Sequence, residues 1–360
     1  MNLYPALVLA ALGQMPAIEM VSVSPPGANE VLVRIMAAGV CHTDLAAVRD
    51  ARACPVVLGH EGAGVVEAVG DGVVSPRPGD HVVINWQAKC GRCRHCLNGR
   101  RDLCEDVKGT SAPRVALGGE PLAVMLNAGC FCPYVVVPAD GAVAIRKDVP
   151  FEKAALLGCS VATGVGAALY TARVAPGDTV AVIGTGGVGL NVVQGARLSN
   201  AVQVVAIDRD QERLAVALRI GATHAVNIDN VDAVAAVREM TGGRGADHVF
   251  EVVGRPHLMA AGIDMLARGG SLTLVGAAGR EEVLTMRPRS FMSKQQRVQG
   301  CIYGNVAPER DLPMFADWYI DGRLQLDLIG TRTIDLVEVP ELFAPNYEHR
   351  GLRAVVVMES

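Results

Sequence analysis

The chain has 360 residues, of which half are hydrophobic, 4% are aromatic and 40 are glycine, so it can form two domains with α/β layers. The net charge of −4 and the lack of a basic block exclude the electrostatic footprint of a nucleic-acid-binding protein. We expect no membrane span, because no segment has the length and apolarity of one. We expect no export signal, because the apolar N-terminal run lacks a positively charged start. Ten cysteines in such a chain predict metal binding in a reducing compartment, the cytoplasm.

The first third alternates strand-like runs with Pro/Gly turns and predicts a small, irregular, β-rich domain. Its strand-like run 31–36 leads into four adjacent polar side chains: Cys41, His42, Thr43 and Asp44. A neighbouring Cys and His pack in a core more often than they perform chemistry. The interpretation therefore depends on whether other segments supply partners.

A second polar pair lies in the glycine-rich run 58–66, which contains His60 and Glu61. The glycines allow the backbone to approach these two side chains closely. A glycine-rich strand with a polar edge is the alternative interpretation.

Four cysteines then occur at the spacing C-x2-C-x2-C-x7-C: Cys90, Cys93, Cys96 and Cys104. Four thiolates can surround one tetrahedral zinc ion, each about 2.3 Å from the metal, and leave no position open for a substrate. Disulfides and an iron–sulfur cluster are the alternatives, although the fourth cysteine lacks the following Pro of the ferredoxin pattern. The spacing favours a structural zinc site that orders a loop with few apolar residues.

The polar, glycine-rich stretch 105–129 is interpreted as a loop, and a strand is predicted over 134–138. The next apolar run, 156–166, predicts a helix with Cys159 at its head. A lone cysteine at such a place is usually a small core residue.

The middle of the chain carries a dinucleotide-binding pattern. A predicted buried strand, 179–183, runs into the G-x-G-x-x-G turn formed by Gly184, Thr185, Gly186, Gly187, Val188 and Gly189, and a helix follows to Leu198. Glycines at these positions permit a tight turn and close approach of a pyrophosphate to the helix N-terminus. A similar fold without a nucleotide is the alternative.

A second strand, 204–207, ends in Asp208, 19 residues after Gly189. An acid at this place binds both ribose hydroxyls and repels a 2′-phosphate, which favours NAD over NADP. Arg209 and Arg213 weaken that preference, because either could pair with a phosphate.

Further strand–helix units up to residue 275 predict a doubly wound parallel sheet. The order of the closing segments suggests a return to the first domain. We therefore predict an α/β protein with a β-rich domain over 1–160 and 303–360, and an inserted dinucleotide-binding Rossmann domain over 161–302.

Together these motifs resemble the zinc-dependent alcohol dehydrogenases of the medium-chain dehydrogenase/reductase family. The resemblance rests on GVCHTD, GHEGAGVV, the four cysteines, LGCSVATGVGA, GTGGVG and GLRAVVV, which occur in family order over nearly the whole chain. It is greatest for the liver-type and class III-like branch, near the thiol-dependent formaldehyde dehydrogenases. The resemblance implies a GroES-like catalytic domain with a catalytic and a structural zinc.

The resemblance also implies roles for single residues. Cys41, His60 and Cys159 match the catalytic zinc ligands, and Glu61 matches a carboxylate that can approach the metal. Asp44 matches the acid that orients the ligand histidine, and Thr43 the hydroxyl that takes the substrate proton before hydride passes to the nicotinamide.

Cofactor and substrate residues follow in the same way. His42 and Arg353 match pyrophosphate-binding positions, Asp208 and Arg213 neighbours of the adenosine ribose, and Val188 a residue behind the nicotinamide. A solvated helix face is the alternative for Arg213. The positions that match the lining of the substrate pocket are Trp86, Met125, Leu126, Ala277 and Ile302, which could instead simply fill the core.

Two departures from the family pattern matter. Ala46 stands where the liver-type proton relay has a histidine, and Lys108 where glutathione-dependent relatives have an arginine. The prediction is an NAD-dependent dehydrogenase of primary alcohols and aldehydes. The alternatives are an S-(hydroxymethyl)thiol dehydrogenase that uses mycothiol or glutathione, and a non-catalytic zinc-binding interaction protein. The stretch of 55 positions from Cys104 to Cys159 resembles that of the dimeric branch of the family, which implies a homodimer, with a homotetramer as the alternative.

Overall fold

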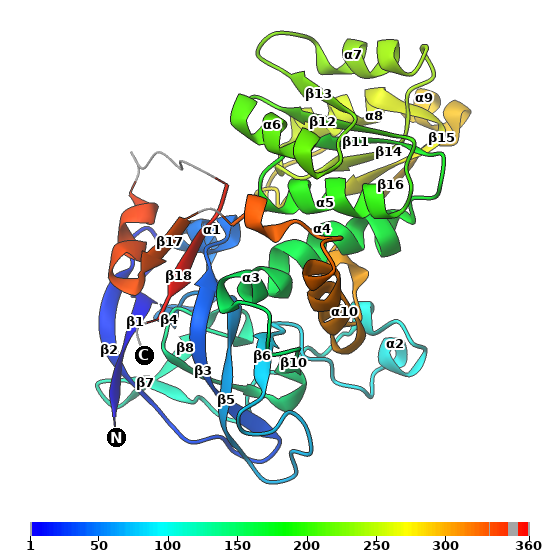
Figure 1. Ribbon diagram of the computed structural model, residues 1–360. Helices are drawn as coiled ribbons and strands as arrows, with labels where there is room; N and C mark the ends of the chain where they lie inside the picture. Colours follow the sequence, from blue (N-terminus) through cyan, green and yellow to red (C-terminus); the bar gives the residue numbers. More distant parts are fainter. Residues whose placement is uncertain (1, 331, 345–351, 359–360) are drawn as a thin grey trace. The chain divides into compact units, whose positions relative to one another are not determined.

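The computed structural model describes residues 2–330, 332–344 and 352–358 (Figure 1). It divides into two compact units, one of Met1–Cys159 with Ala307–Ser360 and one of Ser160–Val306. The second unit is inserted into the first along the chain. The sequence places the limits of this insertion at 161 and 302, against 160 and 306 in the structure.

Within the described residues, the first unit holds a closed barrel and a seven-stranded sheet. The barrel consists, in order, of β1 (Leu3–Leu9), β2 (Ala17–Val23), β7 (Val115–Leu117), β8 (Glu120–Val124) and β4 (Val56–Val57). The sheet consists of β10 (Ala142–Ala144), β6 (His81–Ile84), β5 (Glu61–Val69), β3 (Glu30–Gly39), β18 (Ala354–Val357) and β17 (Arg332–Asp335), with β9 (Tyr134–Pro138) also paired to β3.

Strand β3 organises the first unit. It pairs antiparallel with β5, β9 and β18, and its end at Gly39 lies opposite Glu61 of β5 and Val355 of β18. Three segments far apart in the sequence thus meet at one end of β3. The side chains just beyond that end form the candidate site.

Short helices complete this unit. They are α1 (His42–Asp50), α2 (Arg94–Leu97), α10 (Pro308–Ile320) and the 3₁₀ turns Arg101–Leu103, Met125–Asn127, Ala139–Gly141, Leu326–Leu328 and Leu336–Phe343. The prediction of a plain loop over 105–129 is wrong, because β7 and β8 form an antiparallel hairpin there. The hairpin turns at Gly118 and Gly119, both with positive φ, which glycine adopts without strain.

The helical stretch from 151 to 172 corrects a second prediction. It begins with α3 (Phe151–Leu156), so Cys159 lies inside the stretch and not at its head. A π turn, Leu157–Val161, contains Cys159 and is followed by α4 (Ala162–Gly166) and a second π turn, Ala167–Ala172. The run of small apolar residues from 156 hid the earlier helical start.

This stretch also corrects the prediction that no segment reaches the length and apolarity of a membrane span. Phe151–Ala172 does so, with a mean hydropathy of 1.5 over its most apolar window. That window is 78% buried inside the protein, which is typical of a core helix.

The second unit is a six-stranded parallel sheet in the order β13-β12-β11-β14-β15-β16. Its strands are β11 (Thr179–Ile183), β12 (Gln203–Asp208), β13 (His224–Asn227), β14 (Ala246–Glu251), β15 (Leu266–Leu274) and β16 (Arg297–Gly300). Its other helices are α5 (Gly187–Leu198), α6 (Gln211–Ile220), α7 (Ala233–Met240), α8 (Pro256–Met265), α9 (Pro288–Lys294) and the 3₁₀ turn Tyr303–Asn305.

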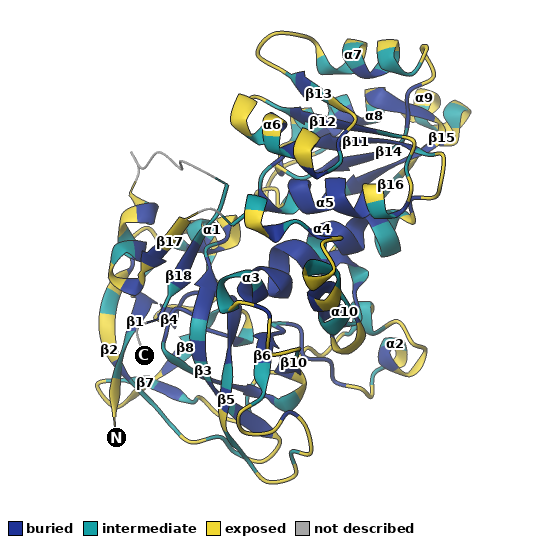
Figure 2. Ribbon diagram, viewed as in Figure 1, coloured by how far each residue is buried: buried dark blue, intermediate teal, exposed yellow. Residues whose placement is uncertain are grey.

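This strand order is that of a doubly wound dinucleotide-binding fold, as predicted. Strand β11 is buried along its whole length, and the central strands are dark in Figure 2. Ala181 and Ile183 pack with Val237 of α7 and Met259 of α8 in one apolar cluster. Because side chains alternate along a strand, the intervening residues face the opposite layer of helices.

Candidate metal centres and nucleotide-binding loop

The first candidate centre begins where β3 ends. Cys41 caps the N-terminus of α1, and its backbone N–H donates to Asp44 Oδ2 at 2.8 Å. Asp44 Oδ1 lies 2.9 Å from Nδ1 of His60. A single buried carboxylate therefore holds both the cap and the imidazole, and it leaves Nε2 of His60 free of this contact.

Cys41, His60, Glu61 and Cys159 form one buried group, whose ligand atoms all lie within 4.8 Å of one another. Two thiols and an imidazole are a common protein ligand set for a zinc ion that keeps one open position. The three predicted ligands, from three separate segments, are thus brought together. The donor set and its spacing fit the zinc ion that the sequence predicts.

Local backbone geometry places Cys159 in this group. The π turn that contains it is a feature often found at functional sites, because it shifts a side chain out of regular helical phase. Its neighbour Gly158 lies against β6, where an added Cβ would be 2.8 Å from the carbonyl oxygen of Ile84. The close packing of this helix on β6 therefore needs glycine next to the cysteine.

The sequence did not reveal that Arg353, from the segment before β18, contacts this group. Its Nη2 donates to Glu61 Oε1, and both side chains are buried. Glu61 Oε2 makes no hydrogen bond in the described part of the chain. A Cβ on Gly39 would lie 2.3 Å from that oxygen, so glycine at the end of β3 makes room for the carboxylate.

Burial and close contact shift the pKa values of several side chains in this group. Burial raises the pKa of Glu61 to about 8, although the Arg353 guanidinium favours the carboxylate. A hydrogen bond with Cys159, together with Arg353 and His60, holds the pKa of the Cys41 thiol well below its usual value. Burial lowers the pKa of His60, but the carboxylate of Asp44 outweighs it and the net pKa is raised. A thiolate beside a cation is the form that ligates a metal.

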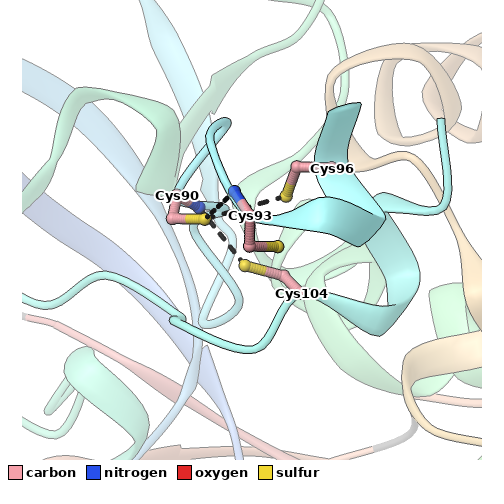
Figure 3. A group of neighbouring side chains, drawn as sticks. All are labelled: Cys90, Cys93, Cys96 and Cys104. Carbon is pink, nitrogen blue, oxygen red and sulfur yellow. Dashed lines mark hydrogen bonds between the residues drawn. The ribbon is translucent and has the colours of Figure 1, made fainter. Parts of the chain in front are cut away.

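The second candidate centre is the cysteine lobe, Cys90, Cys93, Cys96 and Cys104, whose sulfur atoms gather around one point (Figure 3). Cys90 Sγ lies 3.9 Å from Cys96 Sγ, and tetrahedral zinc–thiolate geometry requires about 3.8 Å. Backbone N–H groups donate to two of the sulfurs, Cys93 N to Cys90 Sγ at 3.3 Å and Cys90 N to Cys104 Sγ at 3.4 Å. The described chain records all four as free cysteines, so the disulfide alternative is not formed here.

Other predicted residues of the first unit lie near the buried group. Thr43 Oγ1 is 3.6 Å from Cys41 Sγ and the residue is exposed, as is His42. The indole of Trp86 meets the His60 ring edge to face, with centroids 6.3 Å apart. Met125 packs against the same apolar core as Trp86.

The remaining pocket positions do not form a single set in either unit. Leu126 is 37% exposed in the first unit, and Ala277 and Ile302 belong to the second unit, where Ile302 is 54% exposed. Their role in lining a substrate pocket stays a prediction.

The nucleotide-binding loop has the predicted form. Gly184 has a φ of 92°, and its N–H donates to Ile207 O at 2.8 Å, which ties the loop to β12. An added Cβ on Gly189 would lie 1.8 Å from Gly184 O, so only glycine fits at the start of α5. Gly186 caps α5, Gly187 is its first residue, and Val188 is half-buried.

Asp208 lies at the end of β12 beside this loop. Its Oδ2 accepts from the N–H of Thr185 at 2.6 Å and from the Thr185 hydroxyl at 2.9 Å. Arg213 lies on α6, with Nε 3.3 Å from Asp210 Oδ2. The sequence pattern assigns no role to Thr185, although its place between the first two glycines is a usable signal.

Comparison with known proteins agrees with this geometry. Residues 27–147 match the model of the alcohol dehydrogenase GroES-like domain, and residues 187–320 match that of the zinc-binding dehydrogenase. The chain is 37% identical to an S-(hydroxymethyl)glutathione dehydrogenase of Escherichia coli, with 98% of each chain covered. It belongs to the zinc-dependent alcohol dehydrogenases of the medium-chain dehydrogenase/reductase family, class III-like.

Two solved structures are similar over the full length of both chains. One is an alcohol dehydrogenase zinc-binding domain protein from Burkholderia ambifaria, with a TM-score of 0.93 and 33% identity. The other is a benzyl alcohol dehydrogenase from Acinetobacter calcoaceticus, with a TM-score of 0.92 and 27% identity. The predicted GroES-like and Rossmann architecture is confirmed.

Proposed function

We propose that this protein is a zinc- and NAD-dependent alcohol dehydrogenase that interconverts primary alcohols and aldehydes. The observation that carries the proposal is the buried group of Cys41, His60, Glu61 and Cys159, with all ligand atoms within 4.8 Å. A mixed Cys/His set holds a metal and leaves a position for substrate, which four thiolates do not.

When bound, zinc supplies Lewis acidity that lowers the pKa of an alcohol or polarises an aldehyde carbonyl. Cys41, His60 and Cys159 would hold it. Asp44 accepts a hydrogen bond from the Nδ1–H of His60 and so presents Nε2 as the ligand atom. The hydroxyl of Thr43, exposed and 3.6 Å from Cys41 Sγ, would take the alcohol proton. Ala46 cannot pass it on, so solvent would have to receive it.

The proposal that NAD is the cofactor rests on Asp208 at the end of β12, beside the glycine turn. Two metal ions per chain follow from the two ligand groups. We also propose that His42, Val188, Arg213 and Arg353 contact the dinucleotide, although Arg353 donates to Glu61 in this structure.

The test is a steady-state screen of short-chain and aromatic primary alcohols with NAD and with NADP, before and after removal of zinc. We expect reduced nicotinamide to form with zinc and NAD and to be lost on chelation. If no primary alcohol gave zinc-dependent turnover, the proposal would fail.

A thiol-adduct dehydrogenase is the second candidate. The chain is 37% identical to an S-(hydroxymethyl)glutathione dehydrogenase, and exposed Lys108 stands where such relatives have an arginine. A lysine keeps the charge that would attract an adduct's carboxylate but not the bidentate geometry.

The two candidates separate on one measurement, formaldehyde oxidation with and without glutathione or mycothiol. A thiol-dependent rate that falls in Lys108→Ala but not in the exposed control Lys147→Ala would favour the second candidate. A rate indifferent to thiol would remove it.

We further propose a homodimer, because the stretch from Cys104 to Cys159 is longer than in compact tetrameric relatives. A cytoplasmic location is proposed because the ten cysteines suit metal binding in a reducing compartment. Size-exclusion chromatography with light scattering measures the assembly, and a mass of four chains would contradict the dimer.

A further inference from the structure

The carboxylate of Asp208 is held on both oxygens by donors of the chain itself. Oδ1 accepts from the N–H groups of Arg209 at 2.8 Å and Asp210 at 3.1 Å. Oδ2 accepts from the N–H and the hydroxyl of Thr185 at 2.6 Å and 2.9 Å. Charge-assisted hydrogen bonds to both oxygens fix the orientation of this carboxylate without a cation.

Only one of these donors belongs to a side chain. Three come from backbone N–H groups, which any residue except proline would supply at those positions. The fourth is the hydroxyl of Thr185, so it is the one contact that the choice of amino acid determines.

Thr185 itself is inaccessible, with an exposed fraction of 0%, whereas Asp208 is half-buried. The threonine is therefore inaccessible to a bound ligand, and its hydroxyl can influence a ligand through the carboxylate of Asp208. It also joins two parts of the second unit, because it stands in the glycine turn after β11 and bonds the last residue of β12.

We propose that Thr185 is a positioning residue for cofactor selection: its hydroxyl orients the Asp208 carboxylate toward the ribose of the dinucleotide and couples that acid to the glycine turn. This inference rests on the proposed NAD-binding role of Asp208. Without the hydroxyl, the carboxylate keeps three donors but turns more easily. It then binds a ribose diol less well and repels a 2′-phosphate less.

The test is calorimetric binding of NAD and of NADP to the full-length, zinc-loaded protein, without substrate. In Thr185→Val we expect the Kd for NAD to rise about fivefold, the size of one net hydrogen bond. The Kd for NADP should stay within about twofold of the wild-type value, so that the preference for NAD over NADP falls. Thr185→Ser keeps a hydroxyl and should restore NAD binding.

A double-mutant cycle separates positioning from general stability. In an Asp208→Ala background, Thr185→Val should have no further effect, because the hydroxyl acts only through the acid. The matched control is Thr179→Val, which removes another buried hydroxyl at the opposite end of β11, where Thr179 Oγ1 accepts from Arg244. It should leave both Kd values unchanged.

Several results would overturn the inference: an unchanged or tighter NAD complex in Thr185→Val, equal weakening of NAD and NADP, or additivity in the cycle. If Thr185→Val does not fold, Thr185→Ala carries the same expectation. Failure of the wild type to bind NAD would instead refute the proposed cofactor. Binding by the wild type with no effect of the variants refutes only the role of Thr185.

Discussion

The two ligand groups of the first unit are built in opposite ways. The cysteine lobe takes all four thiols from one stretch of chain, 90–104, and two of them are only half-buried. The group of Cys41, His60, Glu61 and Cys159 comes from three separate segments and is buried throughout. Its Glu61 Oε2 has no hydrogen-bond partner in the described residues. Four thiolates from one loop fill every zinc position and can stabilise that loop. Ligands of mixed type from distant segments can leave one zinc position open for a reaction.

Two Glu–Arg pairs in the same unit, each with a buried glutamate, show a similar contrast. Glu30 accepts from Gly27, Ser111 and Arg114, and the last two contacts hold the start of the 105–129 segment. These donors outweigh burial and lower the pKa of Glu30. Among the described residues, Arg353 donates to one oxygen of Glu61 and no donor bonds the other, and burial raises the pKa of Glu61 to about 8. A fully satisfied pair stabilises the fold, and an incompletely satisfied one marks a functional site.

The largest effect on activity should come from removing a ligand of the group of Cys41, His60, Glu61 and Cys159. Cys159→Ala should lower kcat/KM by about 10³-fold or more, because the metal supplies several kcal/mol of transition-state stabilisation. Elemental analysis should show one zinc fewer per chain, with the lobe zinc kept. Cys132→Ala, a buried cysteine outside both groups, is the control and should keep both zincs. Full activity in Cys159→Ala would refute the division of roles.

Breaking the lobe should instead affect stability. Cys104→Ser should lower the Tm by about 5 °C or more, because the loop loses its metal and has little apolar surface of its own. Calorimetry measures this, with the exposed Cys54→Ser as control. The specific activity of the folded fraction should persist. A variant with wild-type Tm but no activity would place the lobe in catalysis and contradict the comparison.

A smaller effect should follow from a change at Asp44, which contacts the predicted zinc ligand His60. Asp44→Asn keeps the shape but weakens the acceptor for His60 Nδ1, and should lower zinc affinity at this group by about 10- to 100-fold. Competition with a chromogenic chelator measures it. The lobe zinc should not change, and Asp71→Asn in an exposed turn should change neither. Equal loss of both zincs would indicate general unfolding.

The smallest effect concerns the structural Glu–Arg pair. Glu30→Gln should cost about 1 kcal/mol of unfolding free energy at pH 7, since partly buried donors lose a charged acceptor. Because the native pKa of Glu30 lies below 4.5, its stabilisation is complete above that pH and is lost as pH falls through the native pKa. Urea unfolding should therefore show a difference between wild type and variant that shrinks below pH 4.5. A difference that grows on acidification would have the wrong sign.

The sequence predicted much of this fold because several signals are local. Strand 179–183, the helix end at Leu198 and strand 134–138 coincide with β11, α5 and β9. Two predictions are wrong where the local structure depends on tertiary contacts. The sequence predicts a loop at the β7–β8 hairpin because its short strands are stabilised by neighbours in the barrel. It predicts Cys159 at a helix start because π turns have no clear residue signature.

The sequence by itself determined the four-cysteine set and the glycine turn, because C-x2-C-x2-C-x7-C and G-x-G-x-x-G encode their geometry within short segments. The set of Cys41, His60 and Cys159 comes from three separate segments, and in the sequence it is implied only by the family resemblance. Only the tertiary structure decided which groups act on those sets from far along the chain. Pairing of β18 with β3 brings Arg353 to Glu61, and the parallel pairing of β11 with β12 brings the Thr185 hydroxyl to Asp208. Such contacts depend on strand register across 292 and 23 residues, which no local pattern records.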